Sequence, residues 1–123
     1  MTEYIVLIPD NEARWAAADA KEKERVYGLH REFAEALAQR GHKVTGGAEL
    51  VPSSQARTVR RDGSGLQVTE GPYAESVEQL SGFYVVESDD FDDLVQCAGI
   101  LVDDESPIEV RACVDHSGGD GTA

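Results

Sequence analysis

The chain has 123 residues, of which 41% are hydrophobic and 28% are charged, and its formal net charge is −13. This length fits one domain with a single hydrophobic core, and the composition is that of an ordinary soluble globular protein. The first residues do not form a secretory signal, and no apolar run approaches the ~20 residues that span a bilayer. We therefore expect a cytoplasmic protein without membrane contact.

The negative charge is concentrated in one block of the sequence. Residues 1–61 carry ten Lys and Arg against nine Asp and Glu, whereas residues 62–110 carry thirteen Asp and Glu and no Lys or Arg. Such a surface repels a phosphate backbone, so we expect no nucleic-acid partner. A solubilising acidic face is the simplest interpretation, because the block lacks the twelve-residue loop of alternating Asp or Asn with a central Gly that binds calcium.

The first predicted element is a strand over residues 4–8, a β-branched and aromatic run closed by Pro9. An unbroken run of this kind predicts a central strand that is buried on both faces. Residues 10–18 follow as a connecting segment, with Trp15 as the side chain expected to anchor it.

A helix is predicted over residues 20–40. Asp19, with Glu22 three residues later, is typical of an N-cap and capping box, and Gly41 ends the helix. Apolar residues recur at helical spacing on one face, which consists of Val26, His30, Phe33 and Leu37.

The middle of the chain predicts a second strand and a β-hairpin. Residues 42–50 form the strand, in which Gly46-Gly47 indicates a bulge. Residues 55–61 and 66–69 flank an Asp-Gly turn and form the hairpin.

The last third of the chain predicts strand, helix and strand. Residues 82–87 form a strand, and the acidic run that begins at Ser88 opens a helix, where its carboxylates suit the positive end of the helix dipole. Alternation predicts a final strand that buries one face, made of Ile108, Val110, Ala112 and Val114. Residues 115–123 are polar and rich in Gly, and we expect a disordered tail.

The order β-α-β, hairpin, β-α-β predicts a single α+β domain over residues 1–114 of the ferredoxin-like type. Its sheet is expected to be mostly antiparallel, with two helices on one face. The other face of such a sheet is bare, and two chains commonly cover it by packing as a twofold homodimer.

The segment Glu70-Gly-Pro-Tyr-Ala-Glu75 joins a turn to three polar side chains. Gly71 and Pro72 restrict the backbone, so the segment has two interpretations. It is turn chemistry alone, or it holds Glu70, Tyr73 and Glu75 rigidly at the mouth of a pocket.

His30 is the candidate general base. A histidine oriented by a carboxylate accepts protons near neutral pH, and we consider Glu70 and Glu75 as its catalytic partners. The alternative is a hydrogen-bonded core histidine without a catalytic function.

Arg60 and Arg111 are candidates for holding a substrate carboxylate, together with Tyr73 as a substrate-binding residue. The alternative for the arginines is that they are solvated strand-edge residues. Three scattered histidines and two lone cysteines, Cys97 and Cys113, lack the spacing of a metal site, so we expect no metal and no cofactor.

These segments together resemble the DGPF, or YCII-related, family of small α+β proteins over nearly the whole chain. The family motif is Asp-Gly-Pro-Phe-Ala-Glu, and here Glu70 stands in place of the Asp and Tyr73 in place of the Phe. The resemblance implies a fold of the dimeric α/β-barrel type and a pocket with a His–Asp pair. It also implies genes that neighbour extracytoplasmic-function sigma factors.

Three functions remain open from the sequence. The first is a cofactor-independent enzyme for a small molecule, which uses His30 with Glu70 or Glu75. The second is a non-catalytic ligand-binding or regulatory partner protein, with the acidic block facing a basic protein surface. The third is a structural dimer without a ligand.

Overall fold

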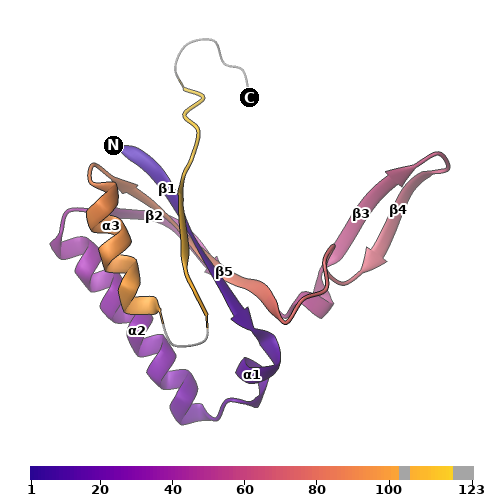
Figure 1. Ribbon diagram of the computed structural model, residues 1–123, viewed down its shortest axis with the longest axis horizontal. Helices are drawn as coiled ribbons and strands as arrows, with labels where there is room; N and C mark the ends of the chain where they lie inside the picture. Colours follow the sequence, from indigo (N-terminus) through magenta and orange to yellow (C-terminus); the bar gives the residue numbers. More distant parts are fainter. Residues whose placement is uncertain (103–105, 118–123) are drawn as a thin grey trace.

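The computed structural model describes residues 1–102 and 106–117 (Figure 1). In chain order the elements are β1 Thr2–Asn11, α1 Glu12–Ala17, α2 Ala20–Gln39, β2 Lys43–Glu49, η1 Ser53–Gln55, β3 Arg57–Asp62, β4 Gly65–Glu70, β5 Glu78–Ser88, α3 Phe91–Ala98, η2 Gly99–Leu101 and β6 Glu109–Ala112. No helix in the described residues is both long enough and apolar enough to cross a membrane.

The main sheet has four strands in the order β2-β5-β1-β6, and its neighbouring strands are all antiparallel. Helices α2 and α3 pack on one side of it (Figure 1). This is the strand order of a ferredoxin-like α+β fold, and it confirms the predicted fold class. The hairpin β3–β4 forms a second sheet of two strands and is inserted between β2 and β5.

The hydrophobic core lies between the helices and one half of the main sheet. Phe33 and Leu37 of α2 and Leu94 of α3 are fully buried. They meet Val6 of β1 and Val86 of β5, which are also fully buried on the helix-facing side of the sheet. The C-terminal half of α2 is therefore fixed by packing, while its N-terminal half extends past this core.

The local predictions for α2 and β2 are confirmed. The Asp19 side chain accepts a hydrogen bond from the Glu22 backbone N–H at 2.8 Å, so one otherwise unpaired donor of the first turn is satisfied. Gly41 has φ +82, a left-handed conformation that favours glycine after a helix end. The β2–β5 register shifts between Val44 and Gly46, where a bulge was predicted.

Three local predictions were wrong. β1 is buried on one face only: Val6 has no exposed surface, but Ile5 on the opposite face is only half-buried. The segment predicted as a plain connection contains α1, a short helix that begins after the N-cap Asn11. The last strand does not continue its buried face to Val114, which is 76% exposed because β6 ends at Ala112.

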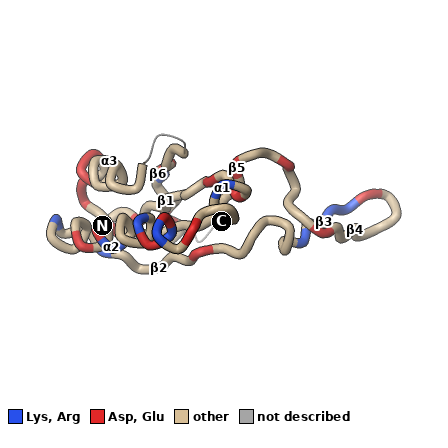
Figure 2. The backbone as a smooth tube through the Cα atoms, turned by 90° about the horizontal axis from the view of Figure 1, so that it is seen from below, with Lys and Arg blue, Asp and Glu red and all other residues tan. Residues whose placement is uncertain are grey.

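The hairpin β3–β4, called the arm below, extends away from the helices and the main sheet (Figures 1 and 2). At its base, the Glu12 carboxylate of α1 accepts hydrogen bonds from the Ser53 N–H at 2.6 Å and the Ser53 hydroxyl at 2.5 Å. Of the predicted disordered tail, residues 115–117 form no helix or strand, and residues 118–123 lie outside the described residues.

Candidate functional site

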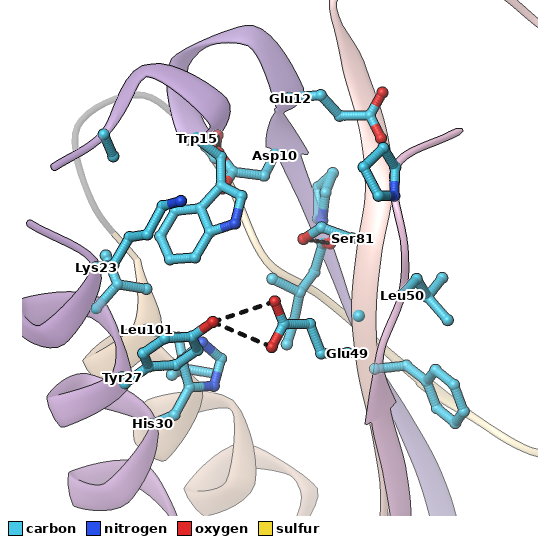
Figure 3. Close-up of a pocket in the computed structure, with 18 of the residues that line it drawn as sticks. Asp10, Glu12, Trp15, Lys23, Tyr27, His30, Glu49, Leu50, Ser81 and Leu101 are labelled. Carbon is cyan, nitrogen blue, oxygen red and sulfur yellow. Dashed lines mark hydrogen bonds between the residues drawn. The ribbon is translucent and has the colours of Figure 1, made fainter. Parts of the chain in front are cut away.

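A pocket of about 890 Å³ lies beside the core, at the other end of the main sheet (Figure 3). Its walls come from the N-terminal half of α2, from α1, and from the adjoining ends of β1, β2 and β5. The same helix thus supplies both the core and the pocket, because α2 is longer than the surface that its apolar partners cover.

The pairing of β2 with β5 explains why this end of the sheet is hollow. Gly47 lies opposite Tyr84, and Glu49 lies opposite Gly82, so the four positions share one face of the sheet. Two of the four carry no side chain, and both glycines line the pocket. A Cβ on Gly47 would lie 2.6 Å from the Phe83 carbonyl oxygen, so this close backbone approach requires glycine.

His30 lines the pocket and is half-buried. Its Nδ1 lies 2.7 Å from the Tyr84 hydroxyl of β5. Burial lowers the pKa of His30, and the negative charge of Glu49 opposes this shift in part. Burial also raises the pKa of the Tyr84 phenol, so the phenol keeps its proton. His30 is therefore a neutral imidazole at neutral pH and has one unprotonated ring nitrogen.

Tyr27 and Glu49 face each other across the same pocket (Figure 3). The Tyr27 hydroxyl lies 3.3 Å from each oxygen of the Glu49 carboxylate. Burial, followed by the charge of Glu49, raises the pKa of Tyr27, which therefore donates its proton to the carboxylate.

The outer wall of the pocket is aromatic and partly charged. The rings of Trp15 and Tyr27 meet edge to face with centroids 5.7 Å apart. The Lys23 Nζ lies 5.4 Å from the centroid of the Trp15 ring, within the range of a cation–π contact. Asp10 accepts a hydrogen bond from the Arg14 guanidinium at 3.0 Å.

The other predicted site residues lie away from this pocket. Glu70 and Glu75 line a second pocket of about 400 Å³ at the base of the arm. Tyr73 is 81% exposed, and its carbonyl accepts a hydrogen bond from Arg60 at 3.2 Å. Arg111 pairs with Glu109 on β6 at 2.8 Å. Within one chain, the structure brings none of these residues into the described lining of the larger pocket with His30.

A separate polar cluster ties α3 to the α2–β2 connection and to the end of β5. His42 is buried, and its Nδ1 lies 2.8 Å from the Ser88 hydroxyl. Its Nε2 lies 2.7 Å from an oxygen of Asp93, whose carboxylate also pairs with Arg40. These two hydrogen bonds, led by that of Arg40, hold the pKa of Asp93 well below its usual range.

The same cluster offers the donor types of a metal site. His42, Asp93 and Cys97 present a nitrogen, an oxygen and a sulfur within 4.8 Å of one another. Arg40 already pairs with this carboxylate, so a metal ion here would lie beside the positive charge of the guanidinium. We therefore assign the cluster a structural role.

The sequence analysis did not identify Glu49 and Tyr84 as site residues. In the structure, Tyr84 is hydrogen-bonded to His30, and the charge of Glu49 acts on the pKa of His30. Both lie on strands, in the segments Gly46-Gly-Ala-Glu-Leu50 and Gly82-Phe-Tyr84, which resemble the family pattern but assign no role to either residue. The glycines at 47 and 82 also mark strand positions without side chains, but their shared face depends on the β2–β5 register.

Comparison with known proteins identifies relatives. The model of the YCII-related domain matches residues 2–99. An uncharacterised protein of Rhizobium meliloti is 33% identical over 99 residues, which cover 77% of this chain and 76% of that protein.

Proposed function

This chain belongs to the YCII-related family, and we propose that it is a cofactor-independent enzyme that transfers a proton to or from a small molecule bound in the larger pocket. His30 is the general base in this proposal. Tyr84 orients the imidazole, and Glu49 is the carboxylate that acts on it through space.

The observation that carries the proposal is the contact between His30 Nδ1 and the Tyr84 hydroxyl at 2.7 Å inside the pocket. If Nδ1 carries the proton and donates it to the phenolic oxygen, the lone pair of Nε2 is available to a substrate. A lowered pKa keeps this nitrogen unprotonated at neutral pH, which is the state that a general base requires. Activity should therefore rise with pH through a value below 6.5 and level off near neutrality.

The tautomer can be tested directly. Long-range ¹H–¹⁵N correlation spectra of the labelled protein at pH 7.5 should show a protonated Nδ1 and a bare Nε2 for His30. A neutral ring with the proton on Nε2 would contradict the assigned base.

The chemistry is tested with ligands found by a thermal-shift screen of small molecules. With the wild-type protein, a true substrate should exchange one hydrogen for deuterium from the solvent. The variant His30→Gln should exchange it about a hundredfold more slowly or worse. His116→Gln changes an exposed histidine and should leave the rate unchanged.

The second candidate is a non-catalytic ligand-binding protein. The observation that favours it is that the hydrogen-bond partner found for His30 among the described residues is a phenol, whereas the predicted catalytic pair required a carboxylate. In this case the wild-type protein and His30→Gln bind the same ligand without hydrogen exchange in either.

We also propose that the protein is a homodimer in which the arm reaches a second copy. A two-stranded hairpin is marginally stable alone in water, and one face of this arm carries Leu66 and Val68, which are 60% and 61% exposed. The sheet face opposite the helices carries half-buried Ile5, Leu7 and Val85, an apolar surface that a second copy can cover. Such a dimer would carry Glu70, Tyr73 and Glu75 toward the partner.

A further inference from the structure

Glu49 differs from Asp10 and Glu12, two other carboxylates that line the larger pocket. Asp10 accepts hydrogen bonds from Arg14 at 3.0 Å and from the Asn11 backbone at 2.8 Å. Glu12 is bonded to Ser53 through two donors. The described residues supply Glu49 with one hydroxyl hydrogen, that of Tyr27, at 3.3 Å from each oxygen. The acceptor capacity of Glu49 is thus largely unused by the protein.

The direction in which the Glu49 carboxylate points determines which groups of a ligand it can reach. Figure 3 shows Glu49 pointing away from its strand toward Tyr27, with Trp15 on one side and His30 on the other. A group placed beside Glu49 therefore meets a negative charge and aromatic rings at the same time. This is the combination that recognises an organic cation.

The wall opposite the sheet already holds a cation. The Lys23 ammonium lies over the face of Trp15 at 5.4 Å from the ring centroid. An ammonium group is thus compatible with this wall, and Lys23 occupies the position over Trp15 and leaves Glu49 open. Arg14, which also lines the pocket, is bonded to Asp10 at 3.0 Å.

We propose that the larger pocket binds a small organic amine in its protonated form, with the ammonium group on the Glu49 carboxylate between Tyr27 and His30. The apolar body of the amine lies against Val26 and Leu101, which line the same cavity. This proposal rests on the pocket assigned above to small-molecule chemistry. An anionic ligand would place like charge beside Glu49, and a neutral ligand would leave the charge of Glu49 unmatched.

The experiment compares three probes of similar size and different charge: 2-phenylethylamine, 2-phenylethanol and 3-phenylpropanoate. Binding is measured by isothermal titration calorimetry at pH 7.5 and at low salt. A charge-assisted hydrogen bond should favour the amine over the alcohol by about tenfold or more, and the carboxylate should bind weakest. Equal or tighter binding of 3-phenylpropanoate, or no binding of any probe, would overturn the proposal.

Two variants assign the effect to Glu49. Glu49→Gln keeps the size of the side chain and should remove about tenfold of the amine affinity while leaving the alcohol unchanged. Glu32→Gln removes the same charge from an exposed position of α2 outside the described lining of the pocket and should keep the preference. Thermal melts confirm that both variants are folded. An unchanged preference in Glu49→Gln would refute the assignment.

The ligand class and the proposed reaction can fail separately. His30→Gln should still bind 2-phenylethylamine, because the ammonium is held by Glu49. If the amine preference holds but substrates show no His30-dependent hydrogen exchange, the binding proposal stands and the enzyme proposal fails.

Discussion

The body of the molecule and the arm differ in how far their apolar side chains are buried. In the body, Phe33, Leu37 and Leu94 have no exposed surface, whereas Val59, Leu66 and Val68 of the arm are 60–61% exposed. The body joins elements that are distant in sequence, while the arm joins two neighbouring strands. The body therefore buries these apolar side chains within one chain, whereas the arm leaves its apolar residues exposed and available to the second copy proposed above.

The pocket belongs to the body, and one of its walls is the helix that the core packs against. His30 is one helical turn from Phe33, so burial of Phe33 in the core also positions the histidine. The second pocket, with Glu70 and Glu75, lies where the arm begins and lacks such support.

The largest expected effect separates the core from the arm. Phe33→Ala should lower the free energy of unfolding by about 3–5 kcal/mol, because it leaves a cavity in the core. Val68→Ala should change the stability of the isolated chain by about 0.5 kcal/mol or less, because this side chain is already largely exposed. Urea unfolding at a concentration too low for association measures both, and similar losses would contradict the comparison.

The next prediction tests the surface that the arm is expected to meet. Leu66→Lys combined with Val68→Lys places two charges on the apolar face of β4 and should weaken dimerisation at least tenfold. Light scattering should then show a change from twice the 13.3 kDa chain mass to a single chain mass.

The matched control uses the same strand. Gln67→Lys combined with Thr69→Lys adds the same charges to the opposite face of β4 and should leave the dimer intact. A wild-type protein that is monomeric at micromolar concentration, or equal effects of the two pairs, would contradict the proposed dimer.

The smallest expected effect concerns the polar cluster that holds α3 in the body. Because the pKa of Asp93 is lowered in the folded protein, its carboxylate contributes stability above the unfolded value near ~4 and loses it as the pH falls below that value. Asp93→Asn should therefore lower stability at pH 7 and flatten the acid part of the profile. Thermal melts from pH 7 to pH 2 measure this, with exposed Asp92→Asn as the control. Parallel profiles for Asp93→Asn and the wild type would refute it.

The features that the sequence by itself determined are those that depend on neighbouring residues. The helix-forming face of α2, the Asp19 cap and the bulge at Gly46-Gly47 all depend on residues a few positions apart, so each could be predicted before any contact was known. The alternation of elements then limited the fold to a ferredoxin-like α+β arrangement. The short helix α1 was not predicted, because its six residues are too few to show a helical repeat of apolar side chains.

The tertiary structure alone decided the surroundings of the candidate base. His30 meets Tyr84 because β5 pairs beside β2 and α2 crosses both, a contact between residues 54 positions apart. The same pairing brings Glu49 into the pocket. It also places Gly47 and Gly82 there, and the space that their missing side chains leave is part of the cavity. His42 is likewise buried beside Asp93 of α3, which lies 51 positions away in the sequence. No local pattern encodes such meetings, because they depend on strand register and helix packing across the whole chain.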